Sequence, residues 1–224
     1  MLPILVILHG WNQSSSHWDM IIQMLEKDFS VITFDLPGFR NEPLEDKNWT
    51  IPDYANWVTS KLENIQGDKI ILGHSFGGRI ASYIASNRPK WLTGLILNGA
   101  PCIYRPSLMI KTKILLAKVL KMLNLKKIFV AKNNELVNAD NNGLGKVFRN
   151  AVSFDQTKIL SQISVPTLLI WGEYDSIVPL RIAKEIQTLI PNSKLSVIDQ
   201  VGHHAQQENP YLFYGITKNF LKNL

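Results

Sequence analysis

The stretch Lys69–Asn87, KIILGHSFGGRIASYIASN, joins a short apolar run, a glycine-flanked serine and an amphipathic segment without interruption. Branched apolar residues over Lys69–Leu72 predict a buried strand. After Gly78, apolar residues recur three and four positions apart, which predicts a helix. Since no polar loop separates the two elements, the chain must turn sharply within Gly73–Gly78, around Ser75.

A sharp turn from strand to helix explains the residue types at these positions. Glycine at positions 73 and 77 lets strand and helix approach, and Ser75 takes a strained conformation that lifts its hydroxyl above the sheet. The N–H of Phe76 then lies at a helix N-terminus, where negative charge is stabilised. This context is typical of a nucleophile elbow. Because Gly-x-Ser-x-Gly also occurs in ordinary turns, partners elsewhere in the chain must decide its meaning.

Alternating strand and helix patterns run through most of the chain. This rhythm predicts an α/β fold with a mostly parallel sheet of about six strands flanked by helices. Residues 104–164 interrupt it after the fourth strand, and we expect them to form a short helical lid on a core of residues 1–103 and 165–224. The other predicted strands are Pro3–Leu8, Val31–Phe34, Leu92–Leu97, Val165–Trp171 and Lys194–Ile198, and helices are predicted at Asp19–Leu25, Ile51–Ile65, Arg79–Ser86, Arg181–Leu189 and Tyr211–Leu221.

The net charge of +6 on the 224 residues is concentrated in one segment. Between Tyr104 and Lys158 there are 11 basic and 3 acidic residues, whereas the remainder holds 13 basic and 15 acidic residues. No arginine-rich run and no basic sheet with interleaved aromatic residues accompanies this excess. The charge therefore does not predict a nucleic-acid partner.

Further compositional features exclude several classes of protein. No apolar run reaches the roughly 18 residues that cross a membrane, and Met1–Leu8 lacks the basic start and cleavage site of a signal peptide. The single Cys102 excludes an internal disulfide and fits a reducing compartment, so a cytoplasmic protein is expected. Because no Cys/His cluster has metal-ligand spacing, neither a metal nor a cofactor is expected.

Candidate functional residues follow the ends of four predicted strands. Trp11, Ser75, Asp175 and His203 each come just after such a strand. The carboxyl ends of parallel strands meet at one edge of the sheet, which is where ligands bind in this class of fold. We therefore expect these side chains to share one site.

Five short motifs, which follow one another along the chain, resemble those of the α/β-hydrolase superfamily. The order serine, aspartate, histidine is also that of this fold. The resemblance extends over most of the chain rather than one window. The motifs are His9-Gly10-Trp11 with Trp18, Asp35-Leu36-Pro37-Gly38, Gly73-His74-Ser75-Phe76-Gly77-Gly78, Trp171-Gly172-x-x-Asp175, and Gly202-His203 with Glu208 and Pro210.

The resemblance implies a serine hydrolase that works through a covalent intermediate. Ser75 is expected to be the nucleophile, His203 the general base and acid, and Asp175 the acid that orients the histidine. Backbone N–H groups of Phe76 and Trp11 are expected to form the oxyanion hole.

Each assignment has an alternative. His204 is the alternative base, although the spacing to Glu208 and Pro210 favours its neighbour. Glu173 is the alternative acid. His74, beside the serine, is expected to border the substrate pocket in a structural, hydrogen-bonded role.

Three features depart from the family pattern. The first predicted strand begins at Pro3, so the sheet starts without the two strands that usually precede it. Arg40 replaces a glycine that commonly closes the Asp-x-Pro-Gly turn. Asn12 replaces a frequent small residue of the oxyanion loop, next to the second donor.

The expected lid suggests a substrate class. Its clearest predicted element is an amphipathic helix around Leu108–Leu123. The apolar side suits an acyl chain, and the basic side suits an acidic acyl carrier protein or an anionic surface, although a solvated helix face fits the same pattern. The apolar side includes Leu108, Leu115 and Leu116, and the basic side includes Lys111, Lys118 and Lys121.

Within the superfamily, the tryptophan after His-Gly and the D-L-P-G-F turn are most similar to small carboxylesterases. These include the enzymes that demethylate pimeloyl esters on acyl carrier protein. Thioesterases, lipases and carbon–carbon bond hydrolases share the same catalytic residues and stay open as alternatives. A binding protein without catalysis is a further alternative, but such a protein tolerates the loss of a catalytic residue, and here all three are present.

Overall fold

The computed structural model describes residues 4–105 and 134–224. Six strands form one sheet in the order β2-β1-β3-β4-β5-β6, and every neighbouring pair is parallel. The predicted α/β architecture with a parallel sheet is confirmed. The strands are β1 (Ile4–Leu8), β2 (Ser30–Phe34), β3 (Lys69–His74), β4 (Leu92–Asn98), β5 (Thr167–Gly172) and β6 (Ser193–Ile198).

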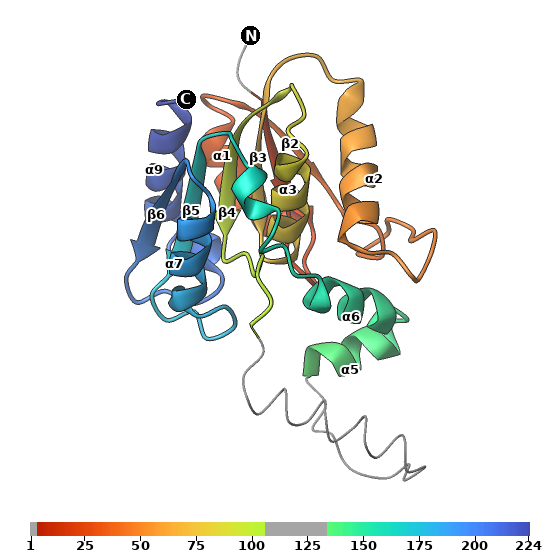
Figure 1. Ribbon diagram of the computed structural model, residues 1–224. Helices are drawn as coiled ribbons and strands as arrows, with labels where there is room; N and C mark the ends of the chain where they lie inside the picture. The colour runs from red at the N-terminus through yellow and green to blue at the C-terminus, as the bar shows by residue number, and fades with distance from the viewer. Residues whose placement is uncertain (1–3, 106–133) are drawn as a thin grey trace, which may run out of the picture.

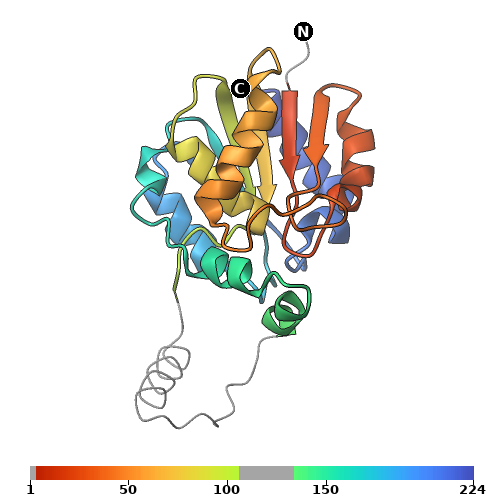
Figure 2. The same cartoon turned by 90° about the vertical axis from the view of Figure 1, so that its right-hand side faces the viewer.

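Helices cover both faces of the sheet (Figures 1 and 2). One face packs against α2 (Ile51–Glu63), α3 (Phe76–Ser86) and α7 (Leu180–Leu189), and the other packs against α1 (Asp19–Leu25) and α9 (Pro210–Leu221). Three short elements also belong to this core, namely η1 (Ser15–Trp18), η2 (Leu160–Gln162) and α8 (Ala205–Glu208).

Strand β1 shows why its sequence is apolar throughout. Val6 and Leu8 belong to the cluster of apolar side chains under α2 and α3. Leu5 and Ile7 belong to the cluster under α1 and α9. Alternate side chains of a strand point to opposite faces, so a strand covered on both sides requires apolar residues at every position.

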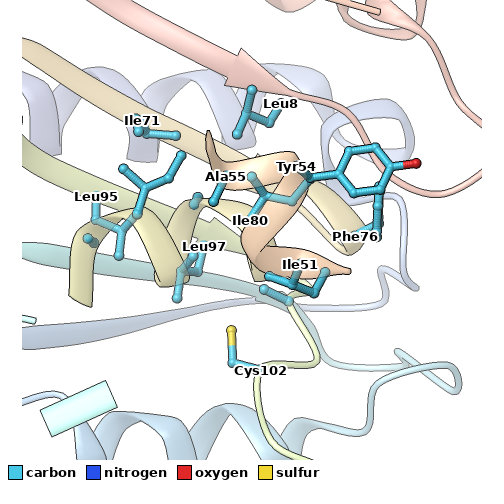
Figure 3. Packing of buried hydrophobic residues seen from close by; sticks show 14 of the residues in the cluster. Leu8, Ile51, Tyr54, Ala55, Ile71, Phe76, Ile80, Leu95, Leu97 and Cys102 are labelled. Carbon is cyan, nitrogen blue, oxygen red and sulfur yellow. The ribbon is translucent and has the colours of Figure 1, made fainter. Parts of the chain in front are cut away.

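Helix α3 is held in the centre of the larger cluster. Figure 3 shows Phe76, at its first turn, against the ring of Tyr54 from α2, and their ring centroids lie 5.0 Å apart in an edge-to-face arrangement. The Tyr54 hydroxyl donates to the carbonyl oxygen of Pro37 at 2.8 Å. Such aromatic pairs contribute about 0.5–1.5 kcal/mol beyond burial. The start of α3 is therefore fixed by side chains as well as by the sheet.

Two described helices lie between β4 and β5, namely α5 (Asn134–Asn141) and α6 (Gly145–Ser153). Figure 2 shows them, in green, beyond the carboxyl ends of the strands. No strand occurs in the part of residues 104–164 that the structure describes. The helix predicted around Leu108–Leu123 lies outside the described residues, and so do the candidate substrate residues Leu108, Leu115 and Leu116 and the basic residues Lys111, Lys118 and Lys121.

The segment that carries α5 and α6 is closed by hydrogen bonds at a neck formed by Cys102, Tyr104, Asp155 and Gln156. The backbone N–H of Gln156 donates to the carbonyl oxygen of Cys102 at 3.0 Å. The N–H of Tyr104 donates to the Asp155 carboxylate at 3.1 Å. The Gln156 side chain also donates to the carbonyl oxygen of Arg79 in α3, at 2.8 Å. The insertion thus leaves and re-enters the sheet at one point.

Candidate active site

Ser75 lies between β3 and α3 in a strained backbone conformation. Its φ of 49° and ψ of −109° are unusual for a residue with a side chain, and such a conformation costs on the order of 1–3 kcal/mol. Hydrogen bonds hold the turn: the Ser75 N–H donates to the Asn98 carbonyl oxygen at 2.9 Å, and its carbonyl oxygen accepts from the Arg79 N–H. The strain expected from the motif is therefore present.

Close contacts explain the two glycines that flank the serine. A Cβ atom on Gly73 would lie 2.5 Å from the carbonyl oxygen of Gly77, and one on Gly77 would overlap the carbonyl oxygen of Leu8. Both neighbours are backbone atoms and cannot move aside cheaply. Only glycine therefore lets α3 start directly against β1 and β3.

Asp175 and His203 form a buried pair beside the turn. The His203 Nδ1 lies 2.8 Å from the Asp175 Oδ2. The other carboxylate oxygen accepts the N–H groups of Ile177 at 2.9 Å and Val178 at 2.7 Å. Because an ionised carboxylate only accepts, the proton of the neutral His203 ring is on Nδ1, and Nε2 carries the lone pair.

Ser75 and His203 border the same cavity, which has a volume of about 700 Å³. No hydrogen bond joins the Ser75 hydroxyl to the His203 ring in this conformation. Contacts of this kind are often long before substrate binds. The cavity is also lined by Trp11, Phe76, His74 and His17, so the structure brings together the candidate site residues that it describes. His17, in η1, also faces the site, although no motif in the sequence pointed to it.

Two backbone donors near the serine have no acceptor among the residues that the structure describes. The N–H groups of Trp11 and Phe76 make no hydrogen bond to any part of the chain that the structure describes. Their side chains form the wall of the cavity, with ring centroids 5.3 Å apart and edge-to-face. Trp11 also packs edge-to-face against Phe39 and Phe148, each at 5.0 Å. These aromatic contacts fix the loop that presents the Trp11 N–H.

Gln13 connects three parts of the site, although no sequence motif marked it as a site residue. Its Oε1 accepts the Gly10 N–H at 2.9 Å and lies 3.0 Å from the His74 Nδ1. Its Nε2 lies 3.2 Å from the His204 Nδ1. Gln13 therefore joins the loop after β1 to the turn of Ser75. Its position three residues after Gly10 was the only available signal.

His74 is fully buried between this network and the candidate base. Its Nε2 lies 3.1 Å from the carbonyl oxygen of His203, and its ring centroid lies 4.9 Å from that of His203. Desolvation, followed by the nearby His203, holds the pKa of His74 well below the usual value. The neutral ring therefore supports the loop that carries His203, the hydrogen-bonded role expected of it.

The two alternative assignments lie in different surroundings. His204 contacts Gln13, and burial followed by the neighbouring His203 lowers its pKa. The Glu173 carboxylate accepts the N–H of Gln200 at 3.1 Å. Neither residue takes part in the pair made by Asp175 and His203.

Comparison with known proteins decides the family. The family model of the alpha/beta hydrolase fold matches residues 3–134 and 121–210 of this chain. The chain belongs to the alpha/beta hydrolase family. As a member of this family it is a hydrolase, and its sheet, flanking helices and strained serine turn are those of the fold.

Two relatives illustrate the range of reactions near this hydrolase. It is 30% identical to the pimeloyl-[acyl-carrier protein] methyl ester esterase of Wigglesworthia glossinidia brevipalpis, over 97% of this chain and 93% of the relative. It is 26% identical to a 2-hydroxy-6-oxononadienedioate/2-hydroxy-6-oxononatrienedioate hydrolase of Cupriavidus pinatubonensis, over 97% and 86% of the two chains.

A solved structure supports the same architecture. The alpha/beta hydrolase MGS-MChE2, from a sediment metagenome of the Mar Chica lagoon, aligns with a TM-score of 0.75 and 25% identity, over 100% of this chain and 92% of that chain. Within residues 4–105 and 134–224, no helix is long and apolar enough to cross a membrane. The same residues hold no group of three or more His, Cys, Asp or Glu side chains arranged for a metal ion.

Proposed function

We propose that this hydrolase cleaves a carboxylic ester through an acyl-enzyme intermediate. The observation that carries the proposal is the buried Asp175–His203 pair at 2.8 Å, next to the strained Ser75 and in the same cavity. Ser75 is the nucleophile, His203 the general base and acid, and Asp175 the residue that holds the ring in the required tautomer.

The reaction follows from the proton positions. The lone pair on the His203 Nε2 takes the hydroxyl proton as the Ser75 Oγ attacks the ester carbonyl carbon. The tetrahedral intermediate collapses, the leaving alcohol takes the proton from His203, and the acyl group stays on Ser75. Water then attacks the acyl-enzyme with the same base and releases the carboxylic acid. No hydrogen bond joins the hydroxyl to the ring in this conformation, so this contact tightens before the first step.

The oxyanion is assigned to the N–H groups of Phe76 and Trp11. Both are without a protein acceptor among the described residues and both residues border the cavity. The Phe76 N–H also lies at the start of α3, where the helix dipole adds to the stabilisation of a negative charge. Loss of one such donor typically lowers the rate by about 10²–10³.

Two relatives bear on the bond that is cleaved. The methyl ester esterase at 30% identity favours an ester, and the carbon–carbon bond hydrolase at 26% identity keeps that reaction as the second candidate. An acyl carrier protein as partner rests on the name of the first relative and on the basic segment from Tyr104 to Lys158. The lid role of residues 104–164 and a cytoplasmic location stay predictions.

The test combines covalent labelling with a substrate panel. A fluorophosphonate probe is expected to label the protein once, and the Ser75→Ala variant is expected to lose labelling at an unchanged melting temperature. Ser60→Ala, at an exposed serine of α2, is the matched control and is expected to label fully. Turnover is then measured on esters, thioesters and a vinylogous diketone acid, which report the ester, thioester and carbon–carbon reactions. Full labelling of Ser75→Ala would contradict the assignment.

A further inference from the structure

One buried charge in the cavity has no part in the proposed mechanism. Arg79 lies on α3 one helical turn after Ser75 and is only 4% exposed, yet it lines the cavity that holds the serine. Long charged side chains are rarely buried without a partner of opposite charge. The surroundings of its guanidinium therefore indicate what the cavity is built to bind.

The described groups that bond to the Arg79 guanidinium are neutral. Its Nη1 donates to the carbonyl oxygen of Phe154 at 2.8 Å, and its Nη2 lies 3.5 Å from that of Val152. Within the described residues, the guanidinium has no carboxylate within 4.0 Å and its Nε–H has no acceptor. Burial lowers the pKa of Arg79 to about 10, so the group stays charged at neutral pH.

Arg105 gives a contrast within the same cavity. It also lines the cavity, but its guanidinium lies 2.6 Å from the Glu185 carboxylate and 3.7 Å from that of Asp155. The charge of Arg105 is thus compensated and partly exposed. Arg79 is buried and has no described carboxylate within 4.0 Å. Against the lowering by burial, the more distant Asp155 carboxylate raises the pKa of Arg79, but it is paired with Arg105.

The rest of the described cavity lining adds no negative charge. Its ionisable side chains are the two arginines, one tyrosine and four histidines, with no aspartate or glutamate among the lining residues that the structure describes. A buried, uncompensated cation costs free energy unless an anion completes it. Arginine is also the side chain best suited to bind a carboxylate through two parallel hydrogen bonds.

We infer that Arg79 forms an anion subsite that binds a second carboxylate, in the acyl part of the ester cleaved at Ser75. This inference rests on the proposed function and names its substrate class. Arg79 lies four positions after Ser75 at the start of α3, so the two backbone positions are about 6 Å apart along the helix axis. The acyl group is therefore a short dicarboxylic acid, esterified at one end and free at the other.

Two related esters test the subsite. The rate of methanol release is measured with monomethyl glutarate, which carries the free carboxylate, and with dimethyl glutarate, which does not. The quantity compared between proteins is kcat/KM for monomethyl glutarate divided by kcat/KM for dimethyl glutarate. The diester has two cleavable bonds, but this factor is the same for every protein and does not affect the comparison. Arg79→Gln is expected to lower this ratio by about 10- to 100-fold, in line with a lost charge-assisted hydrogen bond. The ratio for Arg79→Lys is expected to lie between those of the unmodified protein and Arg79→Gln.

A matched control distinguishes the loss of the subsite from two other effects of the substitution, namely the change in net charge and the loss of a hydrogen bond to a backbone carbonyl. Arg88, just after α3, is exposed and also donates to a backbone carbonyl oxygen, that of Gln162. Arg88→Gln is expected to keep the ratio of the unmodified protein. An equal loss of kcat/KM on both esters in Arg79→Gln would show that Arg79 only anchors Phe154, and would overturn the inference.

A binding experiment tests the subsite without turnover, and its first comparison needs no Arg79 variant. Ser75→Ala protein is titrated calorimetrically with monomethyl glutarate and with dimethyl glutarate, and the monoester, which carries the free carboxylate, is expected to bind at least tenfold more tightly. This preference is expected to disappear in Ser75→Ala/Arg79→Gln. Equal binding of the two ligands by Ser75→Ala protein would overturn the subsite, even if Arg79→Gln does not fold. Preferential binding of monomethyl glutarate without hydrolysis of any ester would instead reject the proposed function and retain the subsite.

Discussion

Gly99 lies directly against the ring of His203. A Cβ atom at position 99 would be 3.1 Å from the His203 Nδ1, and the backbone there has a φ of +54°. The residue that directly follows β4 therefore has no side chain, because the neighbouring space holds the histidine ring. The position of His203 is set by β4 as well as by its own loop.

This contact predicts the effect of adding one methyl group. Gly99→Ala is expected to push the His203 ring away from Asp175, because the new Cβ is tightly placed against both and alanine disfavours a positive φ. We expect kcat to fall at least tenfold, together with a loss of about 1 kcal/mol or more in the free energy of unfolding. Ester hydrolysis and urea unfolding measure the two effects. Unchanged kcat in a folded Gly99→Ala protein would contradict the proposed role of the ring position.

The adjacent residues His203 and His204 are predicted to differ strongly in how much their removal lowers kcat. His203→Ala is expected to lower kcat by about 10⁴, as the loss of a catalytic triad member does. His204→Ala removes a contact to Gln13 and is expected to lower kcat less than tenfold. Steady-state kinetics on one ester compares the two variants directly. Equal losses, or a larger loss in His204→Ala, would reverse the assignment.

Buried His74 predicts a dependence of stability on acid. Both of its nitrogens face oxygen atoms, but burial holds its pKa well below the value of 6.5 expected in the unfolded chain. The unfolded state therefore binds more protons as the pH falls below about 6.5, and stability is lost in that direction. Above that pH this contribution is fully present.

Melting temperatures between pH 5 and pH 8 check this dependence. The His74→Gln variant is expected to be less stable at pH 8, since it loses buried contacts, but to lose less stability on acidification than the unmodified protein. His9 and His204, whose pKa values burial also lowers, retain part of the slope in both proteins. Parallel curves for the two proteins would assign the acid sensitivity to other groups.

The basic residues of the insertion give a prediction about encounter with a partner. Replacement of Lys111, Lys118 and Lys121 by glutamate is expected to raise KM for an acyl ester carried on acyl carrier protein, and more so at low salt. Exposed charges steer association and are screened beyond roughly 8 Å at physiological salt. Hydrolysis of a small neutral ester is the comparison and is expected to change far less. A similar change with both substrates would indicate an effect on pocket shape, and no change with either would leave only a solvated face.

Much of the fold could be predicted because its elements have strong local patterns. Helix α1 has the predicted bounds Asp19–Leu25, and the strands differ from prediction mainly at their ends. Strand β5 begins at Thr167 rather than Val165, after Pro166, which has no N–H to donate. The helix α5 was not predicted, since its sequence NELVNADN is polar and lacks a clear apolar stripe.

The site was predictable where a motif carries the chemistry and not where distant residues meet. Ser75, Asp175 and His203 lie together as their strand-end positions indicated. Gln13 and Arg79 were missed as cavity residues. Gln13 is 61 positions from His74 in sequence, and Arg79 occupies an ordinary position in a predicted helix. Their roles depend on neighbours that only the folded chain brings near.

The neck at Cys102, Tyr104, Asp155 and Gln156 has an evolutionary consequence. Residues 102–104 and 155–156 are bonded to each other, so the chain between them forms a loop whose two ends are held together at the core. A doubling of such a loop costs only about 0.6 kcal/mol in closure entropy. Insertions and deletions in the loop beyond the neck therefore leave the sheet and the strained serine turn nearly unchanged. New substrate ranges can arise there by exchange of one segment, without a second change in the core.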